Sequence, residues 1–252
     1  MGAALECERV IFLSQSQAKR VDALLLKTNI LKLGNDFERA YSTVARIPMF
    51  GLTDSVRFEV LYQRMLCSYL TERFAEADAY ATQIAQNPLY LVEGNHERVI
   101  LFRVLILNEM QKWDEAAQLL YGLAESIPHN DTIREEYNDL LKHYAKGQVP
   151  RLRSEKTLFW VSLFPGAGIV YAGKPLEGVL SFLINSTILA LGVHQFYHGY
   201  YITGYIGGAT LLEKFYTGGR KRSEYLLRKR NFALTNEFNS RVKGSVIRVL
   251  SL

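Results

Sequence analysis

The chain has 252 residues, enough for one large domain or two small ones, and its 48% hydrophobic and 22% charged residues exclude a disordered chain. Its two cysteines, Cys7 and Cys67, lie far apart in the sequence, which excludes a disulfide framework and a multi-cysteine zinc site. The net charge of +5 is uneven: residues 213–248 hold ten Lys/Arg and three Asp/Glu, a charge of +7, so the rest of the chain carries −2.

The first half of the chain has the pattern of packed helices. Good helix formers predominate up to Lys146, and no stretch alternates with period two for long enough to predict a strand. Residues 4–12 read as the second helix of a pair whose first helix is missing. We therefore expect the natural product to extend upstream, or the gene start to be truncated; no signal peptide is visible in the sequence as written.

A short motif recurs three times within this half: an aromatic residue, two mostly polar residues and an alanine. The aromatic and alanine positions are Phe37 and Ala40, Phe74 and Ala77, and Trp113 and Ala116. The alanines are 37 and 39 residues apart, and each motif is followed by a helical run that ends in a proline, at Pro48, Pro88 and Pro128. Periods of this size are typical of stacked helix pairs, in which a small alanine lets two helices approach and an aromatic fills the space between pairs.

In these positions, roughly residues 17–130, the sequence resembles the tetratricopeptide repeat family. The first repeat departs from the family pattern because its second helix is about one turn shorter, and the period exceeds the usual 34. The resemblance implies an α-solenoid over residues 1–148 with a concave face that receives a protein partner. The alternative is a compact helical bundle in which the same alanine and aromatic contacts belong to one core.

A nearly uncharged stretch follows the repeats. Between Thr157 and Leu212 only Lys174 and Glu177 carry a charge, too few for the solvent face of a soluble helical domain of this size. Three apolar segments are visible, at 158–172, 176–193 and 200–212, the last extendable to 217, and a membrane span needs about 20 apolar residues. We predict a glycine-rich transmembrane module over residues 149–219; the alternative is an unusually apolar core domain.

Glycine is concentrated in the same module. Of the 18 glycines, 11 lie between Gly166 and Gly219, including Gly204 and Gly208 in a G-x-x-x-G arrangement. Inside lipid, such small residues allow the backbone contact that holds helices together.

The stretch FPGAGIVYAGKPLEG, residues 164–178, carries a second motif. Its characteristic positions are Pro165, Gly166, Gly168, Tyr171, Gly173 and Gly178. The pattern resembles that of TM2-like small membrane domains, which occur in bacterial envelope proteins and are often fused to soluble repeats; it covers about residues 155–240. The resemblance implies a compact membrane module without a catalytic site. Proline and glycine at these positions suit a bent or re-entrant segment.

Positive charge flanks the uncharged stretch on both sides and predicts the topology. Arg151, Arg153 and Lys156 precede it, and the basic residues Arg220, Lys221, Arg222, Arg228, Lys229 and Arg230 follow it. By the positive-inside rule both flanks stay in the cytoplasm, which requires an even number of spans. We predict spans at about 176–195 and 199–217 in a bacterial inner membrane, with the proline-interrupted first segment not crossing. An upstream signal peptide would instead place the repeats in the periplasm.

Residues 220–252 are predicted to form a basic juxtamembrane amphipathic tail. Leu227, Asn231, Leu234 and Phe238 follow one helical stripe, which the basic residues flank. Such a helix is attracted to anionic lipid, and beside a membrane module this contact is favoured over nucleic-acid binding.

The sequence offers little for catalysis or for holding a cofactor. His194 and His198 are four residues apart and would share a helix face, but no nearby Asp, Glu or Cys completes a zinc site. Neither a G-x-S-x-G elbow nor a phosphate-binding G-x-x-x-x-G-K-[ST] loop is present. We expect no metal, no cofactor and no enzymatic activity.

Taken together, the sequence predicts an all-α protein in which an α-solenoid is joined to a small α-helical membrane module. Its predicted role is that of a non-catalytic adaptor, anchored in the bacterial envelope, which binds a protein or peptide on the repeat surface and lipid through the module. In a rival interpretation the membrane module acts in transport, lipid handling or membrane-protein insertion, and the repeats regulate it. A third, enzymatic interpretation would depend on His194 and His198.

Overall fold

The structure, a computed structural model, describes residues 2–90, 95–124 and 131–251, and this part of the chain is helical without strands, which confirms the all-α prediction. The chain divides into two compact units. The N-terminal unit comprises residues 1–149 together with 239–252, and the hairpin unit comprises residues 150–238.

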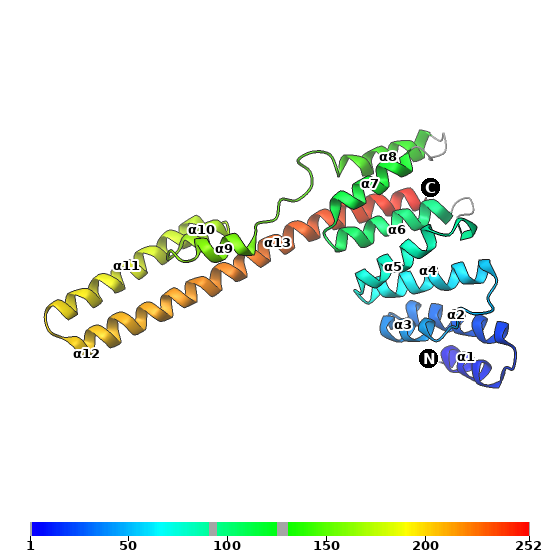
Figure 1. Cartoon of the computed structure of the whole chain (residues 1–252), viewed down its shortest axis with the longest axis horizontal. Helices are drawn as coiled ribbons and strands as arrows, with labels where there is room; N and C mark the ends of the chain where they lie inside the picture. Colours follow the sequence, from blue (N-terminus) through cyan, green and yellow to red (C-terminus); the bar gives the residue numbers. More distant parts are fainter. Residues whose placement is uncertain (1, 91–94, 125–130, 252) are drawn as a thin grey trace. The chain divides into compact units, whose positions relative to one another are not determined.

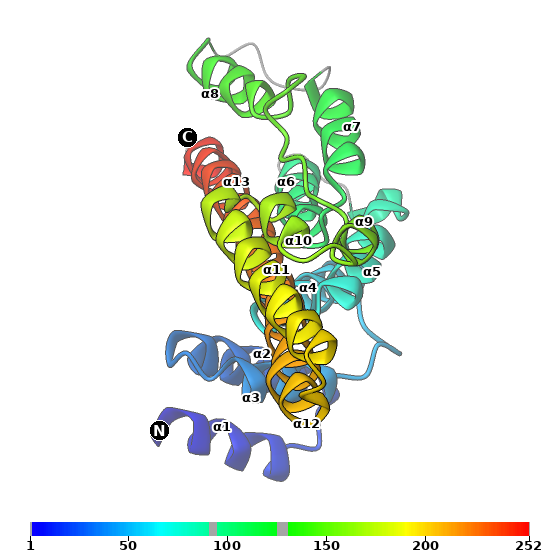
Figure 2. The same ribbon diagram turned by 90° about the vertical axis from the view of Figure 1, so that its left-hand side faces the viewer.

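The N-terminal unit is built of consecutive antiparallel helices (Figures 1 and 2). Its helices are α1 (Gly2–Leu13), α2 (Gln17–Leu33), α3 (Phe37–Ala45), α4 (Asp54–Leu70), α5 (Phe74–Ala85), α6 (Asn95–Glu109), α7 (Trp113–Ala124) and α8 (Asp131–Lys142). Each helix packs on the next one along the chain, from α1 to α8. Sequential packing of this kind leaves every helix pair in contact mainly with its neighbours.

The three recurring aromatic residues are the first residues of α3, α5 and α7. Two positions before each aromatic the backbone has a positive φ, at Asn35 (57°), Glu72 (60°) and Gln111 (59°). The residue after each of these donates its backbone N–H to a carbonyl five residues earlier: Asp36 to Leu31 (2.9 Å), Arg73 to Ser68 (2.8 Å) and Lys112 to Leu107 (2.9 Å). A left-handed residue followed by this bond is a common way to end a helix. The sequence repeat is therefore also a repeat of backbone conformation.

The recurring alanines are fully buried. Ala40, Ala77 and Ala116 each have 0% exposure, and Ala77 packs in a cluster with Leu61 and Met65 of α4 and Ile106 of α6. The aromatics vary more: Trp113 is buried, whereas Phe74 is half-buried and packs edge-on against Tyr69 at 5.7 Å between ring centres.

The ends of the repeats agree with the sequence in two respects. Helix α3 has 9 residues against 12 in each of α5 and α7, so the first repeat is shorter by about one turn, as its sequence predicts. Pro48 lies three residues beyond the end of α3, and Pro88 opens a short 3₁₀ turn, Pro88–Tyr90. Pro128 lies outside the described residues.

Glu8 connects α1 to the helices that follow it. Its carboxylate accepts hydrogen bonds from Arg46 (2.6 Å) and from Lys27, and these bonds, that of Arg46 foremost, lower the pKa of Glu8 to about 2. Because this value is below the ordinary 4.5, the link stabilises the fold at neutral pH and is lost as the pH falls from about 4.5 towards 2.

The end of the chain completes the N-terminal unit. Helix α13 (Leu211–Ser251) is 41 residues long, and the boundary between the two units falls inside it, after Phe238. Beyond this point the Asn239 side chain donates to the Asn108 carbonyl (3.1 Å), and Val242 and Val246 are fully buried. The segment 220–252, expected as one separate tail, is thus divided between the two units, because the apolar stripe continues past Phe238 to Val242 and Val246.

The hairpin unit begins with two short helices, α9 (Glu155–Val161) and α10 (Ala167–Tyr171). Helix α11 (Pro175–Tyr197) follows, and after a turn the chain returns through α12 (Tyr201–Gly204), a π-helical turn (Tyr205–Thr210) and α13. The first apolar segment, 158–172, is therefore broken at Pro165 and Gly166 into two helices of 7 and 5 residues.

We expect the alanine crossings to be intolerant of added volume. Replacing Ala77 with Leu should lower the free energy of unfolding by about 1–3 kcal/mol, because a fully buried crossing must open to admit three further carbons. The measurement is urea unfolding followed by Trp113 fluorescence in a Trp160→Phe background. Ala79, exposed on the same helix, provides the matched control: Ala79→Leu should change stability by less than about 0.5 kcal/mol. Equal effects of the two variants would contradict the crossing.

Candidate membrane-inserting hairpin

The proline-glycine motif forms a tight turn between α9 and α10. Gly166 has φ of 78° and precedes α10, and a Cβ on it would overlap the carbonyl oxygen of Gly178 in the first turn of α11. A Cβ on Gly178 would in turn lie 2.7 Å from the carbonyl oxygen of Gly166. These two motif positions are therefore in contact, and both must be glycine for α10 and α11 to approach this closely.

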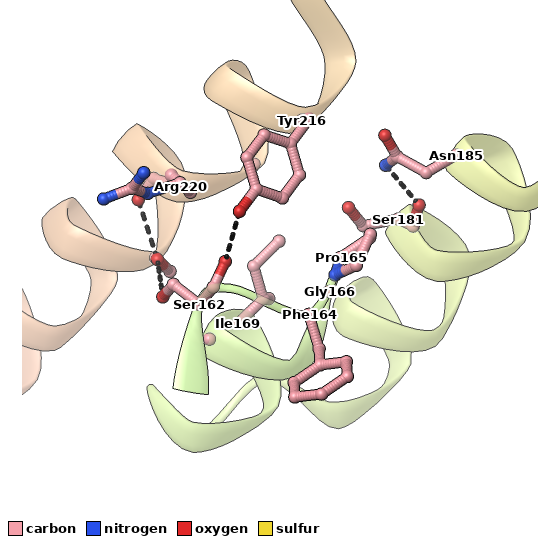
Figure 3. Close-up of a pocket in the computed structure, with 12 residues that line it drawn as sticks. Ser162, Phe164, Pro165, Gly166, Ile169, Ser181, Asn185, Tyr216 and Arg220 are labelled. Atoms are coloured by element: carbon pink, nitrogen blue, oxygen red, sulfur yellow. Dashed lines mark hydrogen bonds between the residues drawn. The ribbon is translucent and has the colours of Figure 1, made fainter. Parts of the chain in front are cut away.

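Polar groups satisfy the backbone where α9 ends (Figure 3). The Tyr216 hydroxyl, from α13, donates to the carbonyls of Ser162 (3.3 Å) and Leu163 (3.2 Å). The Ser162 and Ser223 hydroxyls are 3.2 Å apart, and a Cβ on Gly168 would clash with both side chains. The small residue at 168 thus admits a buried serine pair between α9 and α13.

The end of α10 is held by arginines. The Arg153 guanidinium donates to the Tyr171 carbonyl and lies 5.3 Å from the centre of the Tyr171 ring, while the Tyr171 hydroxyl accepts from the Ser154 N–H (3.2 Å). Gly173 has φ of 102°, and a Cβ on it would lie 3.0 Å from the Arg230 guanidinium. The aromatic and glycine positions of the motif are therefore in contact with two of the flanking cations.

Several members of the predicted basic patch bind protein groups. Arg222 pairs with Glu177 (2.6 Å), Arg228 with Glu155 (3.2 Å), and the Arg220 guanidinium lies 5.2 Å from the Phe159 ring centre. Arg230 contacts the Gly173 turn, as described above, and Lys221 and Lys229 are exposed. The basic patch thus holds helices together at the base of the hairpin, and its two lysines also present positive charge at the surface.

Glycines bring the two arms of the hairpin into backbone contact. A Cβ on Gly208 would lie 2.7 Å from the Cα of Gly192, and a Cβ on Gly192 would lie 2.9 Å from the Cα of Gly208. Gly204 packs against the Phe196 ring. The G-x-x-x-G pair noted in the sequence therefore faces α11, and its partner glycine is Gly192.

Helix α11 is the one helix among the described residues that is long and apolar enough to cross a membrane. Only 17% of its most apolar 18-residue stretch is buried. Large apolar side chains are exposed along its length, including Val179 (55%), Phe182 (52%), Leu191 (59%) and Val193 (61%). The other two apolar segments of the sequence form the short helices α9 and α10 and the α12–α13 arm.

The tip of the hairpin carries the histidine pair. His194 and His198 have ring centres 4.4 Å apart, and Tyr197 (87%) and Tyr200 (62%) are exposed beside them. Among the described residues no group of three or more His, Cys, Asp or Glu side chains could hold a metal ion. Two imidazoles supply half of the ligands of a tetrahedral zinc site.

No protein-family model matches the chain, and neither a curated protein nor a solved structure matches it. The tetratricopeptide-like and TM2-like interpretations therefore depend on the motif residues and on the geometry described above.

Sequence reasoning did not find several residues that hold the hairpin unit together. Asn231 exchanges two hydrogen bonds with the backbone of Arg153 (3.2 and 2.9 Å), and Ser162, Ser223 and Tyr216 close the α9 turn. The sequence showed Asn231 only as one position of the helical stripe, not its bonds to Arg153. Ser162, Ser223 and Tyr216 are isolated polar residues, and their only signal was their place in apolar or basic surroundings. Gly192 stood alone in an apolar run and had no motif to mark it.

We expect a larger side chain to separate the two arms at Gly208 but not at the adjacent Gly207. Gly208→Leu should push the arms apart, because the added carbons meet the α11 backbone, whereas Gly207→Leu should be tolerated because nothing lies within 4 Å of a Cβ there. Spin labels at Leu189 and Leu211, in a chain without Cys7 and Cys67, would report the separation of the arms in detergent. A longer and broader distance distribution is expected for Gly208→Leu alone; equal distributions for the two variants would contradict the crossing.

Proposed function

We propose that the chain is a membrane-anchored, non-catalytic helical-repeat adaptor of the bacterial envelope, in which an α-solenoid of tetratricopeptide-like pairs holds a protein partner near the bilayer. The observation that carries the anchor is the exposure of α11. A 23-residue apolar helix in a water-soluble protein is normally a buried core helix, yet most of this one is uncovered. Lipid removes that apolar surface from water.

The length of α11 suits one crossing, and we assign the second crossing to the returning arm, which is divided among α12, the π-helical turn and the start of α13. At 1.5 Å per residue α11 is about 34 Å long, close to the ~30 Å hydrocarbon core of a bilayer. The tyrosines and histidines of the tip then lie at the far interface, and Arg153 and Arg220 lie at the near one. The positive-inside rule places this near side, with both ends of the chain, in the cytoplasm.

The adaptor surface that we propose is an apolar groove on α1 and α2. Its volume is about 650 Å³, and its apolar walls are formed by Ala3, Cys7, Val10, Ala23, Leu26 and Ile30. These residues are spaced three or four apart on both helices, and Glu6, Lys19 and Asp22 form a charged rim. Apolar walls with this helical spacing and a charged rim suit an amphipathic helix, so we assign the groove to such a helix of the partner.

The anchor predicts resistance to extraction and a defined labelling pattern. Membranes washed with alkaline carbonate should retain the protein, because α11 has no charge between Glu177 and its end. With Cys7 and Cys67 replaced by Ser, single cysteines at the exposed positions Ser154 and Lys221 should resist a membrane-impermeant thiol reagent in spheroplasts, and one at His198 should react. Release by carbonate would refute the anchor; reaction at Ser154 but not Lys221 would mean an odd number of spans.

The groove predicts position-dependent crosslinking. A photo-crosslinking amino acid at Leu26, which lines the groove, should give one discrete polypeptide adduct in cells. The same amino acid at Leu33, exposed on the same helix but outside the groove, should give none. Val10→Asp should abolish the Leu26 adduct because it places a charge on the groove wall. Indistinguishable adducts at Leu26 and Leu33 would refute the assignment.

A further inference from the structure

Three contacts fix the register of the two arms of the hairpin. Near the tip Gly192 lies against Gly208, and at the base Glu177 pairs with Arg222 at 2.6 Å. Between them a Cβ on Gly219 would lie 3.3 Å from the Ser181 hydroxyl. Along α11 the base and tip contacts, at 177 and 192, are fifteen residues apart, and along the returning arm, at 222 and 208, they are fourteen apart. The two arms therefore run side by side with almost one residue opposite each residue.

This register places two charges opposite the middle of α11. Glu213 and Lys214 on the returning arm lie at the level of Ser186 and Thr187, and α11 runs from Pro175 to Tyr197. If α11 crosses a bilayer, as in the proposed function on which this inference rests, both charges are near the midplane. A charged side chain at that depth is unfavourable unless it is paired or faces the protein interior.

Neither charge is compensated within the described part of the chain. Both side chains are exposed, and no ion pair connects either of them to another described residue. By contrast Glu177 and Arg222, nearer the base, are paired with each other. Intramembrane charges are normally paired or face a protein interior, so the exposed surface around Glu213 and Lys214 requires a partner.

The surface beside Lys214 offers room for close approach. Gly218 is exposed, and nothing lies within 4 Å of a Cβ built on it. Beside it runs an apolar groove of about 370 Å³, between α11 and α13, whose lining includes Leu180, Ile184, Lys214 and Phe215. The face thus combines a small residue, an apolar recess and a lysine, as a helix–helix contact in lipid requires.

We propose that this face binds a second copy of the chain, forming a two-fold symmetric dimer in the membrane. A two-fold axis along the membrane normal keeps each residue at its own depth, so Glu213 of one copy is level with Lys214 of the other. The surface is self-complementary, because it carries one charge of each sign on adjacent residues. Two reciprocal Glu213–Lys214 pairs then neutralise all four midplane charges.

Charge exchange tests the dimer. The protein, labelled with donor or acceptor dyes, is reconstituted in liposomes, and energy transfer is measured as the protein-to-lipid ratio is lowered. Glu213→Lys and Lys214→Glu each place four like charges at the interface and should weaken association at least about tenfold. The double exchange, Glu213→Lys with Lys214→Glu, restores reciprocal pairing and should restore wild-type association. Glu224→Lys, an exposed position on the same arm at the level of the base, should have no effect.

The doubly neutral variant, Glu213→Gln with Lys214→Gln, guards against a failure of the charged single variants to insert. It should insert and associate more weakly than the wild type. Single exchanges that associate as the wild type does, or a double exchange that restores nothing, would overturn the inference. A wild-type protein that resists carbonate extraction but stays monomeric would refute the dimer and leave the anchor standing. Release of the wild type by carbonate would refute both.

Discussion

The backbone contact between Gly192 and Gly208 determines the geometry of the whole hairpin. With Cα atoms this close, the two arms cannot slide past one another without driving a side chain into a backbone, so the contact fixes their register. That register aligns Glu177 with Arg222 at the base and places His194 and His198 at the tip. It also sets Glu213 and Lys214 opposite the middle of α11. A larger residue at either glycine would therefore disturb interactions along the full length of the arms.

At the base of the hairpin, the chain turns between α9 and α10, and backbone carbonyls there have no partner within a helix. In an apolar environment each such group must find a partner within the protein. The single hydroxyl proton of Tyr216 is shared between two carbonyls at the end of α9, and the Arg153 guanidinium donates to the carbonyl of Tyr171. The motif glycines make room beside these bonds: Gly168 leaves space for the Ser162 and Ser223 side chains, and Gly166 leaves space for the first turn of α11.

The sequence allowed the helices to be predicted, but not the contacts that are set by distant parts of the chain. The recurring aromatic residues coincide with the starts of α3, α5 and α7. The interruption predicted at Pro165 and Gly166 is also present, because these residues separate α9 from α10. The left-handed turns at Glu72 and Gln111 carried no signal, since neither residue type favours that conformation. Val242 and Val246 were missed because the basic residues before them suggested a juxtamembrane amphipathic tail that lies on lipid. The role of Gly192 depends on its contact with Gly208, and that contact forms only because the two arms lie side by side.

Two uncovered apolar surfaces, the α1–α2 groove and α11, differ in what surrounds them, and this difference argues for different coverings. The groove has Glu6, Lys19 and Asp22 on its rim, so charged groups lie within a helical turn of its apolar walls. Those rim groups must stay hydrated or meet polar groups of a partner, which suits an amphipathic helix that also faces water. Helix α11 carries its one charged residue, Glu177, in its first turn, and no further charge occurs along the chain before Glu213. A protein partner covering so long an uncharged surface would itself need an equally apolar face, whereas hydrocarbon covers it without any polar complement. In the function proposed above, this charge pattern favours a protein partner for the first surface and lipid for the second. Glu213 and Lys214 are then the charges that the returning arm has to accommodate.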